Sequence, residues 1–328
     1  MKILVLDNQQ IRDLLPMAEC IEIMADALAS LARGEVFQPL RTIVRPPEAN
    51  GLLGLMPAFR AGEEGALGLK AICVFPQNPA KGKDAHQGAV LLFSRETGEM
   101  LALMNASAIT AIRTAAVSAV ATRLLAREGP QQLAIIGAGV QARTHLTALA
   151  SVRTIKLARI ACRNIEHAHQ LVREMQPSFP FSIEPVSSNE EAVRGADLIV
   201  TATSSQEPVI NKDWISPGAH VNAIGTHSPH SREIDSATMA TARIFVDRRE
   251  SALNESGDYL LAAKEGLVTP ESIVAEIGEL LVGTKAGRTS PTQITLFKSL
   301  GLAIEDVACA DYLYQKALNE NLGTWVNL

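Results

Sequence analysis

The sequence contains few cysteines, and none of them belongs to a short metal-binding or redox motif. Its four cysteines are far apart and no Cys-x-x-Cys occurs, so the sequence predicts neither a disulfide framework nor a zinc finger. It also lacks an excess of basic residues. The 328-residue chain has a formal net charge of −5, whereas nucleic-acid binders usually present a basic face. We therefore expect no nucleic-acid partner.

Signals for secretion or membrane insertion are also missing. The first residues, MKILVLDNQQIRDLL, show no basic region followed by an apolar core and a cleavage site. No apolar run reaches the roughly 18 residues that a bilayer-spanning helix needs. Hydrophobic residues make up 47% of the chain, which supports a sizeable core and argues against disorder. We expect a cytoplasmic protein in a reducing compartment, with no membrane association.

The chain divides into two parts that differ in their predicted pattern of helices and strands. Over residues 1–128, an amphipathic helix is predicted at 16–34 and is followed by short apolar runs bounded by Pro, Gly and Asn, typical of a largely antiparallel sheet. A long Ala-rich helix is predicted at 107–127, with Ser107 as its N-cap. This part is expected to be a smaller α+β lobe, in which a helix packs on a largely antiparallel sheet.

In residues 129–300, apolar strands alternate with helical stretches, which indicates a parallel sheet with crossover helices. The final helix, within 301–328, is expected to pack back on the first lobe. The predicted fold class is therefore α/β, with a Rossmann-type doubly wound parallel sheet beside the smaller α+β lobe.

A glycine-containing turn follows the first strand of the second part. It reads Gly137-Ala138-Gly139-Val140-Gln141-Ala142, between the apolar run LAII and a helical stretch. In a dinucleotide site, the first glycine permits the tight turn, the second lets the backbone approach the pyrophosphate, and a small last residue permits close packing. Such a pattern is often an ordinary turn, but its place between a strand and a helix favours a phosphate-binding turn that includes Val140 and Gln141.

The end of the second strand indicates which dinucleotide binds. NAD sites usually carry an acidic residue there, but this strand is followed by Cys162, Arg163 and Asn164. Arg163 would bind a 2′-phosphate as a planar, charged fork. Most arginines are simply solvated, but with the upstream turn the sequence favours NADP(H), and NAD(H) stays possible.

Several segments along nearly the whole chain carry a family resemblance. They are QPLRTIV (38–44), GLLGLMPAF (51–59), LGLKAICVFPQN (67–78), HQGAVLLF (86–93), TGEMLALMNASAITAIRTAAVSA (97–119), IIGAGVQA (135–142) and FKSLGLAIEDV (297–307). Together they resemble the ornithine cyclodeaminase/μ-crystallin family. The resemblance implies a homodimer and a Rossmann domain beside a lobe, residues 1–128, that serves substrate binding and dimerisation. It also implies chemistry at the carbon that bears the amino or imino group of a small amino acid.

Three cationic residues match the family's substrate contacts. The resemblance assigns Arg41 and Arg113 to the substrate carboxylate and Lys70 to a further substrate contact. This fits elementary chemistry, because an α-carboxylate is well held by a charged bidentate partner. Arg113 lies in a stretch rich in Ala, Ile and Val, where a buried charge would require a partner.

The resemblance assigns further residues to the cofactor and the pocket. Glu255 matches a pocket-lining position. Thr203 also lies at the end of the apolar run LIVTAT, where cofactor contacts are usual. The residues matched to cofactor contacts are His86, Gln87, Thr203, Ile224, Gly225 and Ser299.

One departure from the family pattern concerns His227. In the cyclodeaminases and alanine dehydrogenases an aspartate handles the substrate amine, but here the stretch reads VNAIGTHSPH. A mostly neutral group has thus replaced an anion. His220, His227 and His230 could suggest a metal site, but no thiol or carboxylate completes a standard ligand set, and no metal is predicted.

The combined expectation is an NADPH-dependent reductase that converts a small cyclic imino acid, of the Δ1-pyrroline-2-carboxylate or Δ1-piperideine-2-carboxylate type, to the cyclic amino acid. Lys70 and His227 are the candidate proton donors, and Arg113 is the expected catalytic carboxylate clamp. Two alternatives stay open at this stage. One is a cyclodeaminase-type lyase or an alanine dehydrogenase-type enzyme, and the other is a μ-crystallin-like small-ligand binder.

Overall fold

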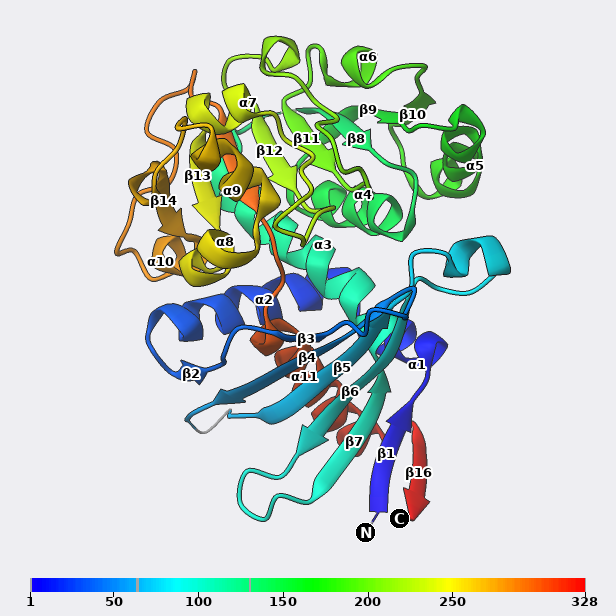
Figure 1. The fold of residues 1–328 in the computed structure, drawn as a ribbon. Helices are drawn as coiled ribbons and strands as arrows, with labels where there is room; N and C mark the ends of the chain where they lie inside the picture. Colours follow the sequence, from blue (N-terminus) through cyan, green and yellow to red (C-terminus); the bar gives the residue numbers. More distant parts are fainter. Residues whose placement is uncertain (1, 63–64, 130, 328) are drawn as a thin grey trace. The chain divides into compact units, whose positions relative to one another are not determined.

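The computed structural model describes residues 2–62, 65–129 and 131–327. Contacts divide the chain into two compact units (Figure 1). The first, called the lobe, comprises Met1–Arg113 and Gly301–Leu328, and the second, called the dinucleotide unit, comprises Thr114–Leu300. Each unit contains an eight-stranded sheet, and the predicted α/β architecture is confirmed.

The boundary between the units lies within the long helix α3 (Ala106–Leu125), whereas the sequence placed it after residue 128. The reason is that the second half of α3 bonds to the dinucleotide unit. His145 Nε2 lies 2.9 Å from the Ser118 hydroxyl, and the Asn222 amide donates to the Thr122 hydroxyl at 3.0 Å.

The lobe pairs its sheet with two long helices. Its strand order is β16-β1-β7-β6-β5-β4-β2, with β3 also paired to β4. All these pairs are antiparallel except β1 with β7. Its elements are β1 (Lys2–Leu6), α1 (Asn8–Leu14), α2 (Met17–Ala32), β2 (Val36–Phe37), β3 (Thr42–Val44), β4 (Leu52–Arg60), β5 (Leu67–Val74), η1 (Asn78–Lys81), β6 (His86–Phe93), β7 (Met100–Asn105), α11 (Ala303–Glu320) and β16 (Thr324–Asn327).

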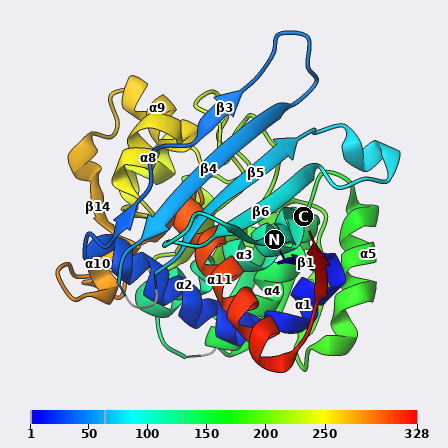
Figure 2. The same ribbon diagram turned by 90° about the horizontal axis from the view of Figure 1, so that it is seen from below.

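Helices α2 and α11 lie on the same face of the lobe sheet (Figure 2). Strand residues that point to that face, such as Met56, Ile72, Val90 and Met104, are buried. The helix predicted at 16–34 is α2, and the expected return of the C-terminal helix to the lobe is α11.

The opposite face of the lobe sheet carries a continuous apolar row. Cross-strand register places Pro57 beside Leu69, Leu69 beside Leu91, Leu91 beside Leu103, and Leu103 beside Val5. Leu103 is 36% exposed, and Leu69 and Leu91 are partly exposed. The run GAVLLFS lies in the interior strand β6, because β5 and β7 pair with its two sides.

The dinucleotide unit is a parallel sheet of order β10-β9-β8-β11-β12-β15-β13-β14. The chain builds outward from β8 first through β9 and then, in the other direction, through β11, so the order reverses between β8 and β11. Its elements are β8 (Gln131–Ile136), α4 (Val140–Val152), β9 (Ile155–Ala161), α5 (Ile165–Met175), η2 (Gln176–Ser178), β10 (Ser182–Pro185), α6 (Asn189–Val193), β11 (Leu198–Thr201), η3 (Lys212–Trp214), β12 (His220–Ala223), α7 (Ser236–Thr241), β13 (Arg243–Val246), α8 (Arg249–Glu255), α9 (Gly257–Lys264), η4 (Pro270–Ser272), β14 (Ile273–Glu276), α10 (Ile277–Leu281) and β15 (Thr295–Lys298).

Helix α3 differs from its sequence description in two respects. Its first turn is capped by Asn105, whose side-chain oxygen accepts from the Ala108 N–H at 2.9 Å, and not by Ser107, whose hydroxyl donates to the His86 carbonyl. Among the helices described, α3 is also long and apolar enough to cross a membrane, although polar residues such as Arg113 interrupt it. In the structure, 83% of that apolar window is buried, as in the core helix of a folded unit.

Candidate active site

The lobe brings two predicted cations together around one carboxylate. Lys70 is on β5, Arg113 is on α3, and Asp306 is on α11. The Lys70 Nζ lies 2.9 Å from Asp306 Oδ2, and the Arg113 Nε lies 3.0 Å from Asp306 Oδ1. The Arg113 Nη1 also lies 2.6 Å from Glu305 Oε2. These groups form a buried charge cluster, called below the lobe cluster.

The elements that carry the lobe cluster also explain its burial. Lys70 and Ile72 lie on the same inward side of β5. The Lys70 side chain therefore runs among apolar side chains towards α11. Lys70 is 3% exposed, Arg113 is 4% exposed, and Asp306 is fully buried. Buried charges persist only when they are paired and hydrogen-bonded, and the shared carboxylate meets that requirement.

Burial and neighbouring charges act in opposition on these groups. Burial lowers the pKa of Lys70, Asp306 raises it, and Arg113 and Arg41 lower it, so that the net pKa is about 8. Burial alone would raise the pKa of Asp306, but Arg113 and Lys70 hold it below its usual range. The pKa of Arg113 is raised because its two carboxylates outweigh its burial. Lys70 is therefore the member that titrates nearest neutral pH.

Arg41 joins the cluster through Gly301. Its Nη2 donates to the Gly301 carbonyl at 2.9 Å. Gly301 has a φ of +77°, and a Cβ there would lie 2.7 Å from the Arg113 Nη1. A side chain at this position would thus be strained and would displace the guanidinium. The structure brings together all three cations that the sequence assigned to substrate, Arg41, Lys70 and Arg113.

His86 and Gln87 begin β6, in the same lobe. His86 is exposed by surface area, yet its surroundings exclude enough water to lower its pKa, and the charges of Lys70 and Arg113 lower it further. Gln87 donates to the Asp84 carbonyl at 3.0 Å. His86 therefore lies within electrostatic range of the lobe cluster, whereas the side-chain amide of Gln87 holds the turn before β6.

Sequence reasoning missed Glu305 and Asp306. Both are fully buried on α11 and supply the anions of the lobe cluster. The available signal was their setting: two adjacent acidic residues stand in the apolar stretch LAIEDVACA. A pair of carboxylates so placed needs cationic partners, by the same reasoning that was applied to Arg113.

The glycine turn has the geometry of a phosphate-binding loop. Gly137 has a φ of +120°, and a Cβ there would lie 2.4 Å from the Ala202 carbonyl oxygen, so only glycine fits. A Cβ on Gly139 would meet nothing within 4 Å, and Gly139 caps α4 without a side-chain hydrogen bond. The first N–H groups of α4 are thus available to an anion, which the helix dipole also favours.

The residues predicted to choose the dinucleotide lie beside this turn. The Gly137 N–H donates to the Ala161 carbonyl at 2.8 Å, which fixes the turn against the end of β9. Arg163 follows two residues later and is exposed. The Asn164 side chain accepts from the Glu166 N–H at 3.1 Å and caps α5. Arg163 thus places an exposed positive charge near the turn, whereas the side chain of Asn164 caps a helix.

One buried carboxylate ties the loops after β11 and β12 together. Glu233 accepts from the Thr203 N–H at 2.6 Å, from the Gly225 N–H at 2.6 Å and from the Thr201 hydroxyl at 3.0 Å. Thr203 and Gly225 are two of the predicted cofactor residues, and a third, Ile224, directly follows β12 and is buried. Glu233 was missed by sequence reasoning because its partners are two backbone N–H groups and a threonine hydroxyl, which form no recognisable sequence motif with it.

A second buried ion pair, Lys298 with Asp258, holds the loop that follows β12. Lys298 lies 2.9 Å from Asp258 and donates to the Thr226 carbonyl at 2.9 Å. Asp258 in turn accepts from the backbone N–H groups of Glu233 and Ile234, at 2.8 and 2.9 Å. The segment that follows β12 is therefore fixed at both ends.

Three other predicted residues are placed as follows. Ser299 follows β15, is buried, and donates its backbone N–H to the Ala223 carbonyl at 3.1 Å. Glu255 ends α8 and is half-buried. His227 lies exposed on the loop after β12. In the described part of the chain, no group of three His, Cys, Asp or Glu residues could hold a metal ion.

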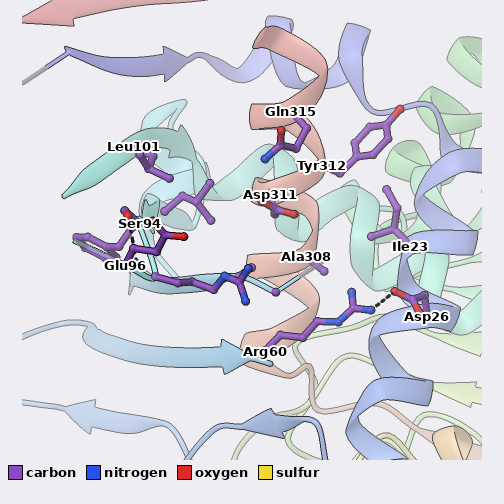
Figure 3. Close-up of a pocket in the computed structure, with 15 residues that line it drawn as sticks. Ile23, Asp26, Arg60, Ser94, Glu96, Leu101, Ala308, Asp311, Tyr312 and Gln315 are labelled. Carbon is purple, nitrogen blue, oxygen red and sulfur yellow. Dashed lines mark hydrogen bonds and ion pairs between the residues drawn. The ribbon is translucent and has the colours of Figure 1, made fainter. Parts of the chain in front are cut away.

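A cavity of about 670 Å³ also opens in the lobe, apart from the predicted site residues. It lies between α2, α11 and the turns that follow β4 and β6, and Arg60 pairs with Asp26 across it at 2.5 Å (Figure 3). None of the residues assigned to substrate or cofactor lines it. The candidate substrate site is therefore the lobe cluster and the candidate cofactor site is the glycine turn of the dinucleotide unit, each described within its own unit, and neither is this cavity.

Comparison with known proteins shows the family of the chain. The model of the ornithine cyclodeaminase/mu-crystallin family matches residues 1–321. The chain belongs to this family. Among its members, the ketimine reductase mu-crystallin of Mus musculus is 40% identical over 291 residues, which cover 88% of each chain.

Two solved structures of family members also superpose closely. The Δ1-pyrroline-2-carboxylate reductase of Thermococcus litoralis, in complex with NADH and L-proline, is 40% identical with a TM-score of 0.96, covering 99% of this chain and 100% of that one. An archaeal alanine dehydrogenase dimer with bound NAD is 34% identical with a TM-score of 0.93, covering 100% of both chains. These two reductases act on C=N bonds, and the archaeal alanine dehydrogenase is a dimer.

Proposed function

We propose that this protein reduces a small cyclic imino acid to the cyclic amino acid and uses NADPH in preference to NADH. The observation that carries the proposal is the lobe cluster: Arg41, Lys70 and Arg113 come from three separate segments and converge in one place. Arginine and lysine so arranged suit a substrate carboxylate. The similarity to a ketimine reductase and to a pyrroline-2-carboxylate reductase supports the reaction type.

The nicotinamide, when bound, supplies the hydride. The chain's own residues do the rest. Arg41 and Arg113 hold the carboxylate and so orient the C=N carbon, which can contribute several kcal/mol to the barrier reduction. Gly137, Gly139 and the first turn of α4 hold the pyrophosphate. A proton must also reach the imine nitrogen, and Lys70 is the better donor because it lies within the cluster, whereas His227 lies on an exposed loop.

The preference for NADPH rests on Arg163. It follows the end of β9, the strand against which Gly137 is fixed, and no carboxylate stands there to repel a 2′-phosphate. The two solved relatives were obtained with NADH and with NAD, so we expect NADH to be accepted as the weaker cofactor.

We further propose that the protein forms a homodimer through the open face of the lobe sheet. The row from Val5 to Pro57 crosses five strands and presents leucines to solvent, which is unusual for a monomer. A second copy provides a self-complementary cover, and the related alanine dehydrogenase is a dimer. In light scattering, Leu103→Glu should yield monomers, whereas Leu318→Glu, at a residue 43% exposed on α11, should not; a monomeric wild type would contradict the proposal.

The test of the reaction is a substrate screen that follows NADPH oxidation. Its arms are five- and six-membered cyclic imino acids, pyruvate with ammonia, and ornithine assayed for ammonia release. We expect turnover with the cyclic imines and little or none with ornithine, because His227 replaces the aspartate that the resemblance assigns to the amine. Comparable turnover of ornithine would establish a lyase instead.

The arm with pyruvate and ammonia tests the second candidate function, an alanine dehydrogenase-type activity. The 34% identity to the archaeal alanine dehydrogenase favours it. Turnover there that exceeds turnover of the cyclic imines would favour the dehydrogenase, and tight binding of imino acids with no turnover in any arm would indicate a small-ligand binder.

A further inference from the structure

Asp306 divides its carboxylate between the two functional cations of the lobe. Oδ2 faces the Lys70 Nζ at 2.9 Å, and Oδ1 faces the Arg113 Nε at 3.0 Å. All three side chains are at most 5% exposed. A single rigid carboxylate therefore fixes the separation of the ammonium and the guanidinium.

The hydrogen bonds of Lys70 leave one donor for a ligand. An ammonium group has three N–H bonds. Two of them are donated to Asp306 Oδ2 and to the Thr110 hydroxyl, the latter at 3.2 Å. Within the part of the chain that the structure describes, the third has no partner. Asp306 and Thr110 together thus set the direction in which the third N–H points.

We propose that Asp306 is a positioning residue for the reaction: it keeps Lys70 cationic and aims its third N–H, so that Lys70 delivers the proton to the imine nitrogen. This inference rests on the proposed imine reduction. In that step the imine carbon accepts a hydride from the reduced nicotinamide, and the C=N π pair moves to nitrogen. The nitrogen takes the proton from the Lys70 Nζ. Lys70, which is then a neutral amine, regains a proton from water.

The charges that face Lys70 come from four elements. Asp306 on α11 favours the ammonium form, whereas Arg113 on α3 and Arg41 before β3 oppose it, and His86 on β6 is in turn affected by the charge of Lys70. The net result is a pKa of about 8 for Lys70. Because the protonated form is the active one, activity should be present below this pH and be lost as the pH rises through it.

Glu305 provides a matched control for Asp306. The two carboxylates are adjacent on α11 and both are fully buried. Both pair with Arg113, but of the two only Asp306 has a hydrogen bond or ion pair with Lys70 among the contacts described. The comparison of Asp306→Asn with Glu305→Gln therefore separates an effect on Lys70 from the loss of a buried negative charge.

The experiment measures kcat/KM for a cyclic imine from acid to alkaline pH in the wild type and both variants. Asp306→Asn should lower kcat and move the basic limb down by about 1–3 pH units, the usual effect of one nearby opposite charge. Glu305→Gln should raise KM and leave the limb near its wild-type position. All three proteins are assayed with the same substrate, so a difference in the pH of the basic limb must come from a protein group and not from titration of the substrate.

A second readout does not depend on turnover. NMR of 13Cε-labelled lysine, with the Lys70 signal assigned from Lys70→Arg, gives the pKa of Lys70 in each protein. Asp306→Asn should lower it more than Glu305→Gln does. Should Asp306→Asn fail to fold, Asp306→Glu retains the charge; it should keep the basic limb in place while kcat falls.

Three results would overturn the inference. In the first, the basic limb of the kcat/KM profile does not move in Asp306→Asn. In the second, it moves equally in Asp306→Asn and Glu305→Gln, and in the third, it moves down in Asp306→Glu by the amount expected for Asp306→Asn. These differ from failure of the proposed function, in which the wild type itself reduces no cyclic imine.

Discussion

Replacement of Arg113 by alanine should damage both stability and activity, for separable reasons. The guanidinium is 4% exposed and bonds to two fully buried carboxylates, at 2.6 Å to Glu305 and 3.0 Å to Asp306. Its removal leaves buried negative charge uncompensated, which costs about 3–5 kcal/mol in comparable cases. The matched surface change is Arg194→Ala, which breaks an exposed pair with Glu190 and should cost less than about 1 kcal/mol.

The activity loss has a different origin. A bidentate charged contact to the substrate carboxylate is worth about 2–4 kcal/mol. That corresponds to a fall of roughly 30- to 1000-fold in kcat/KM. Urea denaturation measures the first effect, and NADPH oxidation with a cyclic imine at a temperature where the variant is folded measures the second.

A double variant separates the two effects. Arg113→Ala with Glu305→Gln removes one of the two carboxylates that have lost the guanidinium as a partner, so it should recover about 1–3 kcal/mol of stability without recovering activity. The reasoning is refuted if Arg113→Ala unfolds at the wild-type urea concentration, or if the double variant regains both stability and activity. The latter result would mean that Arg113 has a structural role only.

Three further predictions concern the dinucleotide unit. Arg163→Ala should raise KM for NADPH by roughly tenfold or more while changing KM for NADH little, because only NADPH carries the 2′-phosphate; equal changes in steady-state kinetics would contradict the assignment. Glu233→Gln leaves one of three donors without an acceptor, so it should lower stability by about 1–3 kcal/mol and weaken cofactor binding, as measured by calorimetry; unaltered cofactor affinity would mean that the loops do not need this tie. Burial lowers the pKa of His145 to about 4, below its unfolded value. The unfolded state therefore binds the extra proton first, and stability should be intact above pH 6.5 and fall by up to about 3 kcal/mol towards pH 4; His145→Gln should reduce that slope in urea denaturation, and an unchanged slope would contradict the burial of a neutral ring.

The sequence predicted elements whose signals are local. The Gly137 turn was visible because strand, glycines and helix follow one another within a few residues, and α2 and α3 were visible from their length and periodicity. The cap of α3 was misassigned by two residues, since Ser107 and Asn105 are both good caps and only the structure shows that Ser107 bonds to His86 instead. Strands β1 and β16 were missed because each gains its place in the sheet from a partner distant in sequence.

The parts of the site that the sequence did not predict are the anions. Cations such as Arg41 and Lys70 could be assigned by their resemblance to family contacts, but Asp306 lies 236 residues from Lys70 in the chain. An acidic pair on a helix usually faces solvent. Only the return of α11 to the lobe sheet shows that this pair is buried and that its partners are Lys70 and Arg113.

The carboxylates also change how the site should be understood. Two arginines and a lysine over-provide for one substrate carboxylate, and so much positive charge in a buried place would be costly. Asp306 and Glu305 reduce this cost, because both pair with Arg113 and Asp306 also pairs with Lys70. Buried charges persist only when they are paired and hydrogen-bonded. In the proposed reaction, the acidic pair is therefore what allows buried cations to be present where a substrate carboxylate would bind.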